Sequence, residues 1–234
     1  RNSLYARRDL LTGKDIRKGF VRFHVIERGK DRAIAAPRFS ERVIQKAVTR
    51  AVVAPAVWPT LTPGCAANMR GRGTDYALMR LKGQLAEHYR RHGADGYVLL
   101  MAFSDYFGTI DHGTALDLVK RTLTDTAAVE FMRLLIEANG MIGLGLGSEP
   151  NQALAVAIPS PLDYLGERWR GIEASGRYMD DSYFIALDKD TLWRFLDAAR
   201  ALCSSLGITI NERKTKVVKL TRRFTFLKKG FRFT

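Results

Sequence analysis

The sequence predicts an α+β fold built around a mainly antiparallel sheet, and three observations support this class. Residues 21–37 alternate apolar and polar side chains on both sides of a basic, glycine-containing turn, which is typical of a β-hairpin. Residues 96–103 form a nearly unbroken apolar run, as in a buried central strand. Helical patterns separate these segments from a strand–turn–strand pattern at 177–187, and hairpins mixed with helices indicate an α+β chain.

In the N-terminal part, proline, glycine and capping residues mark where elements begin and end. Ser40 is expected to cap a helix that begins at Glu41 and runs toward Pro55. The other elements expected there are a helical or partly irregular basic segment at 1–20, the hairpin at 21–37, turns at 59–75 and a helix from about 75 to 91.

After the strand at 96–103, helical periodicity alternates with short strand patterns, and we see no internal repeat or low-complexity linker. Asp180 and Asp181 fall at the tip of the hairpin at 177–187. The remaining expected elements are helices at 112–122, 126–139, 150–169 and 190–205, and short strands at 208–210, 216–220 and 224–233.

Composition places the chain among globular proteins that bind polyanions. With 234 residues, 46% hydrophobic and 26% charged, it is large enough for a real core, and it has no apolar run long enough to cross a membrane. The two cysteines lie far apart and predict buried thiols in a reducing compartment, the cytoplasm. Because the chain begins with Arg1 and shows no signal-peptide pattern, we interpret it as a piece or processed form of a longer protein.

The positive charge is concentrated at the two ends. The formal net charge is +14; residues 1–50 hold 14 Lys and Arg against 5 Asp and Glu, and residues 201–234 hold 9 against 1. The centre, 51–200, carries 15 against 18 and is mildly acidic. Basic ends around an acidic centre favour a nucleic acid as partner, because each phosphate that a cation neutralises releases a counterion. A basic surface kept for solubility does not require this segregation.

The most informative segment is Tyr178-Met179-Asp180-Asp181, followed by an aromatic and aliphatic strand. Two adjacent carboxylates repel each other, and a divalent cation is the usual way to neutralise them. A bare Asp-Asp pair is more often a simple turn. Here the flanking residues favour the functional interpretation, because the segment resembles the Tyr-x-Asp-Asp box of reverse transcriptases.

Other segments resemble the remaining boxes of that family, in the family's order. They are a fingers hairpin and helix at 29–45 and a fingers segment at 71–78, a first palm motif at 102–112, a glycine-rich second motif at 143–152, a fourth motif at 206–215 and a primer-grip hairpin at 226–231. The resemblance covers about 20–234 and is closest to bacterial and phage retroelement reverse transcriptases, the lineage of group II introns, retrons and diversity-generating retroelements. It implies a right-hand polymerase with fingers at 1–95 and a palm at 96–234, the two partly interleaved. The helical thumb is then expected in a missing segment or in an accessory protein.

One position departs from the family pattern. The first palm motif should begin with a metal-binding Asp, and anchoring it on Ile110-Asp111 places that Asp at Ala102 and the following aromatic at Phe107. Anchoring on Asp105 instead loses this spacing and puts the carboxylate outside the apolar run. We therefore interpret Ala102 as a missing carboxylate, removed by substitution or lost naturally. Substitution is favoured, because Asp to Ala abolishes catalysis there without disturbing the strand.

The resemblance also implies roles for the site residues. Asp180 and Asp181, with the main-chain carbonyl of Phe103, are the implied ligands of two Mg²⁺ ions, with Mn²⁺ as an alternative. The implied primer grip is Phe226, Leu227 and Lys228. The implied dNTP-binding residues are Arg28, Lys30, Arg32, Phe107, Gln152 and Lys214, with Phe107 as a steric gate against ribonucleotides and Lys214 as a candidate general acid. The implied partners are an RNA template, a DNA primer and product, and dNTPs, with no membrane.

Several alternatives stay open at this level. Phe107 can be an ordinary core residue, and Lys214 an ordinary surface lysine. The whole chain can be a catalytically dead polymerase fold that binds nucleic acid as a scaffold, or a polymerase that works without a template or copies RNA into RNA. His88 and His92 have i, i+4 spacing, but no third ligand is apparent, so they are interpreted as surface residues and not a zinc site.

Overall fold

The computed structural model describes residues 20–27, 30–138 and 140–233. The predicted element at 1–20 therefore lies outside the described residues, apart from Phe20. Within the described part the strands form three sheets: the β1–β2 hairpin, a four-stranded sheet in the order β4-β5-β3-β6, and the β7–β8 hairpin, with every pairing antiparallel. The predicted α+β class is confirmed.

The element bounds follow the sequence patterns closely. The strands are β1 Phe20–Glu27, β2 Lys30–Pro37, β3 Tyr97–Ala102, β4 Ala174–Tyr178, β5 Asp181–Ala186, β6 Lys216–Lys219, β7 Phe224–Phe226 and β8 Lys229–Phe231. The helices are α2 Phe39–Val48, a π-helical turn η1 Thr49–Val53, α3 Ala54–Val57, a 3₁₀ turn η2 Trp58–Thr60, α4 Thr74–His92, α5 Tyr106–Thr109, α6 His112–Thr122, α7 Thr126–Glu137, α8 Glu149–Ala157, α9 Ser160–Arg168 and α10 Lys189–Ser205.

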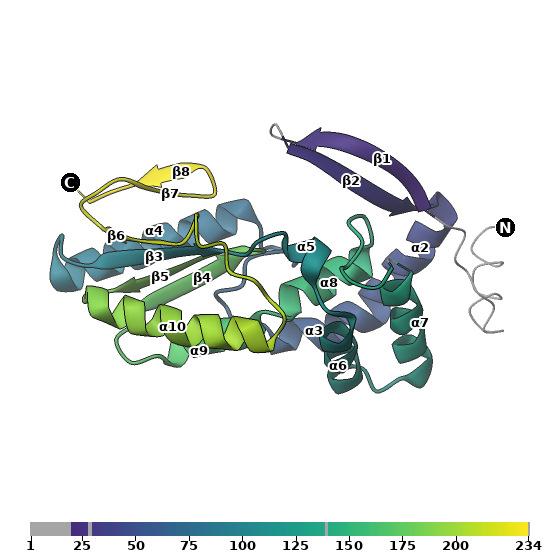
Figure 1. Cartoon of the computed structure of the whole chain (residues 1–234). Helices are drawn as coiled ribbons and strands as arrows, with labels where there is room; N and C mark the ends of the chain where they lie inside the picture. The colour runs from purple at the N-terminus through teal and green to yellow at the C-terminus, as the bar shows by residue number, and fades with distance from the viewer. Residues whose placement is uncertain (1–19, 28–29, 139, 234) are drawn as a thin grey trace.

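The four-stranded sheet is covered on both faces, and the strand period of two assigns its side chains to them. On one face, Leu99 and Met101 of β3 pack with the apolar sides of α9 and α10. On the other face, Val98 and Leu100 join Leu81 of α4 and the buried aromatics of β7 in a second cluster. Figure 1 shows α10 and α9 on one side of the sheet, with α4 and the β7–β8 hairpin on the other. Burial on both faces explains why 96–103 is apolar at almost every position.

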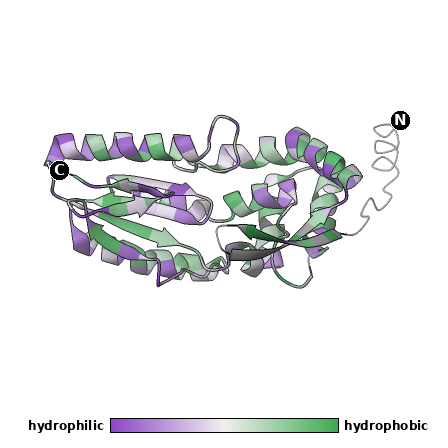
Figure 2. Ribbon diagram, turned by 90° about the horizontal axis from the view of Figure 1, so that it is seen from above, coloured by the Kyte–Doolittle hydropathy of each residue, from purple (hydrophilic) through white to green (hydrophobic). Residues whose placement is uncertain are grey.

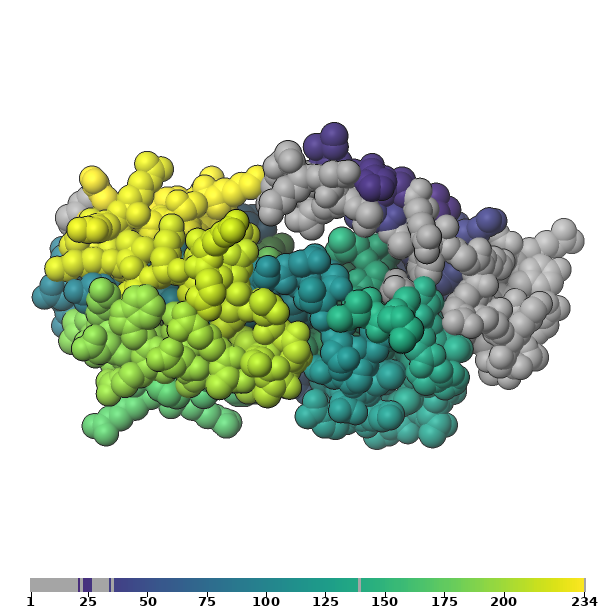
Figure 3. Space-filling view, in the orientation of Figure 1, coloured from purple at the N-terminus to yellow at the C-terminus, as the bar shows by residue number. Residues whose placement is uncertain are grey.

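A second group of helices continues from the end of β3. Helices α6, α7 and α8 pack together, and α8 also contacts α2, η1 and α3. Figure 1 shows the β1–β2 hairpin projecting above this group, while the β7–β8 hairpin lies over the sheet. In the space-filling view an open space lies above the teal residues of the middle of the chain, beside the yellow C-terminal segment (Figure 3). In the described residues, no helix is long and apolar enough to span a membrane.

Two helix boundaries differ from the prediction. Helix α2 begins at Phe39 with Arg38 as its N-cap, so Ser40 lies inside the helix and does not cap it. Pro55 does not end the helical run either, because the π-helical turn Thr49–Val53 precedes it and places Pro55 in the first turn of α3. A proline is tolerated there, since the first backbone N–H groups of a helix need no intrahelical partner.

The predicted helix at 150–169 is two helices, α8 and α9. Pro159 stands between them as the N-cap of α9, and its missing N–H cannot continue the hydrogen-bond ladder of α8. The expected strand at 208–210 is reduced to a single bridge between Phe103 and Ile210. The segment 224–233 forms a hairpin of two short strands, as the hairpin expected at 226–231 requires.

Hydropathy along the ribbon agrees with this layering. Figure 2 shows the strands of the central sheet mostly in hydrophobic colours, whereas the helices alternate hydrophilic and hydrophobic residues around their axes. Both cysteines are buried free thiols, as the sequence predicts. Burial is the largest effect on the pKa of both thiols. It raises the pKa of the Cys203 thiol to about 12 and also raises the pKa of the Cys65 thiol.

Replacing Gly176 of β4 and Gly83 of α4 by alanine should change the free energy of unfolding in opposite directions. A Cβ on Gly176 of β4 would stand 2.5 Å from the hydroxyl of Tyr183, which itself donates to Gln84 at 2.6 Å. Gly83 lies on the exposed side of α4 with nothing within 4 Å of such a Cβ. We expect Gly176→Ala to lower the free energy of unfolding by about 1–3 kcal/mol, through overpacking.

The matched control, Gly83→Ala, should raise it by about 1 kcal/mol, because alanine loses less backbone entropy in a helix. Urea denaturation of both variants checks the pair. Equal effects of the two substitutions would contradict the packing of β4 under α4.

Candidate active site

The candidate site is built on the tip of the β4–β5 hairpin. Tyr178 pairs with Asp181, which leaves Met179 and Asp180 as a two-residue turn. Met179 adopts a left-handed backbone conformation with φ of 55°, which disfavours residues other than glycine, asparagine and aspartate. Both aspartates are only partly buried. The turn is therefore held in a costly conformation while its carboxylates stay accessible.

A buried arginine holds this turn. The side chain of Arg177 is 1% exposed and donates from Nη1 to the carbonyl of Met179 at 3.0 Å. The same guanidinium forms a bidentate pair with Asp163 of α9, with N–O distances of 2.8 and 2.7 Å, and donates to the carbonyl of Val156 in α8 at 2.8 Å. Burial alone would lower the pKa of Arg177, but the adjacent Asp163 carboxylate outweighs it and the pKa is raised, so the guanidinium stays charged.

The end of β3 lies directly against the hairpin tip. Ala102 is the cross-strand partner of Asp181, so the two side chains lie on the same face of the sheet. The N–H of Phe103 donates to the carbonyl of Asp180 at 3.2 Å, which fastens the tip to the strand end. Ala102 is 3% exposed. A longer side chain at position 102 would therefore start beside Asp181, at the position that the resemblance gives to the first metal-binding Asp.

On its other edge, the end of β3 is tied to the segment after α10. The carbonyl of Ala102 accepts from the N–H of Asn211 at 2.8 Å, and the N–H of Ser104 donates to the carbonyl of Thr209 at 2.8 Å. These bonds flank Phe103 and do not use its carbonyl. That oxygen therefore remains a suitable additional ligand next to Asp180.

Asp105 occupies a different place. It is exposed, lies past the end of β3, and begins the short helix α5 with φ of 41°. Its carboxylate lies back over α5, within 2.6–2.9 Å of where a Cβ on Gly108 would stand. The carboxylate is thus directed at its own turn, and this placement favours Ala102 over Asp105 as the first-motif position.

Three aromatic rings line the chain just after the strand. Phe103 and Tyr106 have ring centroids 5.1 Å apart, and Tyr106 meets Phe107 edge-on at 5.8 Å. The Tyr106 hydroxyl donates to the carbonyl of Ala155 at 2.6 Å, and burial is the largest effect raising its pKa. Phe107 is half-buried and packs against the main core. The aromatic at the expected gate position is thus fixed in place with one side left accessible.

The glycine-rich loop of the second motif packs against the same helical turn. The N–H of Leu144 donates to the carbonyl of Phe107 at 2.8 Å, and a Cβ on Gly143 would stand 2.9 Å from the carbonyl of Gly108. Gly143 has φ of +88°, so both its backbone and its close contact require glycine. His112 adds a hydrogen bond at 2.8 Å to the Gly143 carbonyl. The first two palm motifs of the resemblance are therefore in contact.

Helix α8 carries Gln152, which is half-buried, and a neighbour that the sequence analysis did not single out. Asn151 is fully buried, and neither its side-chain nitrogen nor its oxygen has a hydrogen-bond partner. Ser148, at the N-cap of this helix, also has an unpaired hydroxyl. Buried polar groups are normally paired, so Asn151 and Ser148 stand out among the described side chains of this region. In the sequence, only its place beside Gln152 could have drawn attention to Asn151.

The structure describes only part of the remaining predicted dNTP-binding residues. Arg28 lies outside the described residues, and so do the side chains of Lys30 and Arg32, whose backbones belong to β2. Lys214 is exposed in the turn that follows Asn211.

The predicted primer grip is the turn between β7 and β8. Leu227 and Lys228 form it with φ of 46° and 68°. Phe226 is 4% exposed and meets the Tyr183 ring edge-on at 5.0 Å, so it is part of the core under this hairpin.

Comparison with solved structures identifies the fold. Apo telomerase from Candida tropicalis, truncated from its C-terminal domain, aligns with a TM-score of 0.69 at 13% identity, over 99% of this chain and 58% of that one. Telomerase from Candida albicans in complex with a TWJ fragment of telomeric RNA gives 0.64 at 10% identity, over 90% and 44%. No protein-family model and no curated protein matches the sequence. The chain has a reverse-transcriptase-like fold and spans less than two thirds of these telomerase chains.

Removing the carboxylate that neutralises Arg177 should be costly. We expect Asp163→Ala to lower the free energy of unfolding by about 3–5 kcal/mol, because it leaves a charged guanidinium buried without its partner. The matched control is Asp197→Ala, which removes an exposed carboxylate that also pairs with an arginine, Arg200, at 2.8 Å. Water screens that pair, so the control should change stability little. Similar losses for both variants in urea denaturation would show that the buried pair does not hold the site.

Proposed function

We propose that this chain is the fingers and palm part of an RNA-directed DNA polymerase of the bacterial and phage retroelement lineage, with one catalytic carboxylate replaced by Ala102. The observation that carries the proposal is the pairing of Ala102 with Asp181, next to the bond from Phe103 to Asp180. The two carboxylates of the tip therefore lie beside the end of β3, and the resemblance assigns the family's first-motif Asp to that strand end. The fold supports the class, and the motif residues support the lineage.

The donor set at the tip suits divalent cations. Asp180 and Asp181 offer carboxylate oxygens, and Phe103 a carbonyl oxygen, which are the ligands that Mg²⁺ prefers. Two such ions would activate a primer 3′-hydroxyl and stabilise the leaving pyrophosphate. The methyl group of Ala102 offers no ligand, so the chain as given would hold such a pair with one carboxylate fewer.

The residues around the tip would position the other reactants. The half-buried ring of Phe107, held by its neighbours Tyr106 and Leu144, would lie against the sugar of an incoming dNTP and reject a 2′-hydroxyl. Gln152 would contact the nucleotide from α8, and Arg28, Lys30, Arg32 and Lys214 would neutralise its triphosphate. The turn at Leu227 and Lys228 would contact the primer.

The proposed partners are an RNA template, a DNA primer and product, and dNTPs. The basic segments 1–50 and 201–234 would neutralise phosphates on both sides of the acidic centre. A telomerase with the same fold was solved with a fragment of telomeric RNA. A thumb or an accessory protein would complete the grip on the duplex, and the absence of disulfides suits a cytoplasmic enzyme.

A second candidate function rests on Ala102 itself. A buried alanine at this position fits a polymerase fold that binds nucleic acid without extending it. The same contacts to template and nucleotide would then serve a scaffold, and the two functions differ only in the response to a restored carboxylate.

Restoring that carboxylate tests the proposal. Ala102→Asp should raise primer extension on an RNA template with Mg²⁺ and dNTPs by about 100-fold or more, since each 1.4 kcal/mol of regained transition-state stabilisation is worth tenfold. The matched control is Ala102→Asn, which has nearly the same shape without the charge and should stay inactive. Robust extension by the chain as given would contradict the proposal, and binding without extension by Ala102→Asp would favour the scaffold.

The steric gate is tested in the active background. Phe107→Ala combined with Ala102→Asp should incorporate ribonucleotides more readily relative to dNTPs, because the ring no longer excludes the 2′-hydroxyl. Phe131→Ala, which removes another partly buried ring that packs on the same core, is the control and should leave sugar selectivity unchanged. Unchanged selectivity in the Phe107 variant would assign this ring to the core alone.

A further inference from the structure

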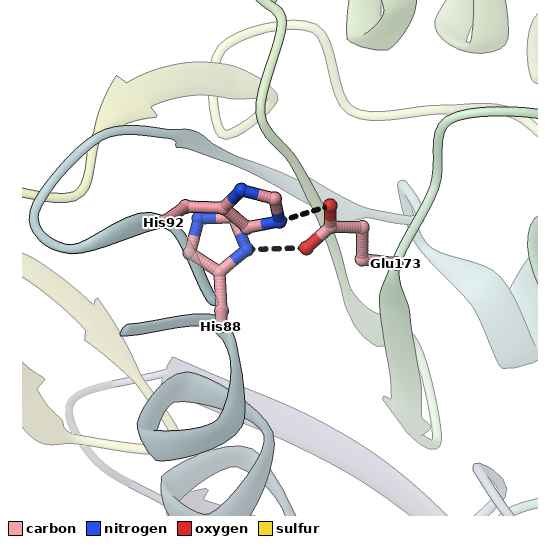
Figure 4. A group of neighbouring side chains, drawn as sticks. All are labelled: His88, His92 and Glu173. Atoms are coloured by element: carbon pink, nitrogen blue, oxygen red, sulfur yellow. Dashed lines mark hydrogen bonds and ion pairs between the residues drawn. The ribbon is translucent and has the colours of Figure 1, made fainter. Parts of the chain in front are cut away.

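A cluster of two histidines and a glutamate lies at the opposite end of the central sheet from Asp180. His88 and His92 come from the last turns of α4, and Glu173 from the residue before β4 (Figure 4). The surface assignment of His88 is wrong: its side chain is 1% exposed, because the C-terminal end of α4 packs against the sheet. Glu173 supplies the third group that the sequence did not reveal.

The contacts of His88 require an extra positive charge. Its Nδ1 lies 2.7 Å from one carboxylate oxygen of Glu173, and its Nε2 lies 2.7 Å from the carbonyl of Asp95. Both partners only accept hydrogen bonds, whereas a neutral imidazole has a single N–H to donate. Either the ring carries two protons, or its Nε2–H donates to Asp95 and a cation lies between Nδ1 and the carboxylate.

His92 approaches the same carboxylate from a second direction. Its Nε2 lies 2.7 Å from the other oxygen of Glu173. The ligand atoms of all three residues lie within 4.8 Å of one another. One cation between them would satisfy both nitrogens and the carboxylate together, whereas a cation-free cluster needs one added proton, on His88, since a neutral His92 can donate its single N–H to Glu173.

The neighbours fix the orientation of the buried ring. A Cβ on Gly96 would stand 2.3 Å from the Nε2 of His88, so only glycine leaves room for the ring there. Phe233 stacks on the ring with centroids 6.3 Å apart. The Asp95 carbonyl requires a proton on Nε2, so in a neutral ring the lone pair of Nδ1 points at Glu173. Such an outer hydrogen bond is how metal-binding histidines are usually oriented.

We propose that His88 Nδ1, His92 Nε2 and the Glu173 carboxylate bind a zinc ion. Two imidazoles and one carboxylate are a zinc donor set, while Mg²⁺ and Ca²⁺ prefer oxygen ligands. Tetrahedral coordination at zinc distances separates ligand atoms by about 3.3 Å, so the carboxylate must withdraw by roughly half an ångström from each nitrogen. Glu173 and His92 are 24% and 26% exposed, which allows this shift and admits water as the fourth ligand.

The position of the cluster indicates a structural role. It joins the end of α4, the turn before β3 and the start of β4, and the backbone N–H of Glu173 is itself bonded to Ile185 of β5 at 2.9 Å. The strand β3 separates it from Ala102 by about 15–20 Å, at 3.3 Å per residue. Zinc here would clamp α4 to the sheet and stabilise the folded chain by binding it in preference to the unfolded chain.

The test is a zinc titration of the chelator-treated full chain in excess Mg²⁺, which occupies hard oxygen sites. We expect saturable binding of one zinc per chain and a rise in the unfolding temperature. Cobalt(II) at the same site should show the intense visible absorption of tetrahedral coordination. Glu173→Gln and His92→Gln should each weaken zinc binding by about 100-fold, since even the loss of an outer-shell partner costs about 10–100-fold.

The matched control is His24→Gln, which removes an exposed histidine on β1, outside the cluster, and should bind zinc as the parent chain does. His92→Gln decides the matter if Glu173→Gln fails to fold, because His92 is a quarter exposed. No saturable zinc binding by the parent chain, or equal binding by the parent and His92→Gln, would overturn the proposal and leave a protonated ion-pair cluster.

Discussion

A guanidinium buried in a protein core is tolerated only when a carboxylate balances its charge and acceptors pair with its N–H groups. Arg177 is such a buried guanidinium, and its surroundings must meet this requirement. Its side chain connects Asp163 on α9, Val156 on α8 and the carbonyl of Met179 in the hairpin turn. Its backbone pairs with Gly64 and Ala66, which brings in the segment before α4. The conformation of the hairpin tip, and hence the position of its two aspartates, depends on this one residue.

The tip and the cluster at Glu173 lie at opposite ends of the same strands. At one end, the partly buried carboxylates of Asp180 and Asp181 face the end of β3 at Ala102, where we propose that an acid is missing. At the other end, the imidazoles of His88 and His92 converge on a single carboxylate. The paired strands β3 and β5 run between the two places.

Local patterns predicted the strands and most helices, because period-two burial and turn residues act over a few positions. The tip at Asp180 was predictable for the same reason, since both carboxylates are adjacent in sequence. Asp163 and Glu173 were not predictable, because their partners, Arg177 and the two histidines, lie elsewhere in the sequence. Asn151 was not predictable either, because the sequence does not show that its side chain is buried without a hydrogen-bond partner. The break at Pro159 was missed for another reason. The helical pattern continues on both sides of this proline, so 150–169 was interpreted as one helix, whereas Pro159 precedes a new helix.

The central claim is that positions 102, 180 and 181 form one cation site, with Asp105 outside it. Paramagnetic broadening of amide NMR signals by substoichiometric Mn²⁺, measured on the Ala102→Asp variant, tests this most directly. The account predicts the strongest broadening at the end of β3 and at residues 179–182, weaker broadening of the same signals in the chain as given, and little change when Asp105 is replaced by asparagine. Broadening centred on Asp105, or broadening unchanged by restoring the carboxylate at 102, would contradict it.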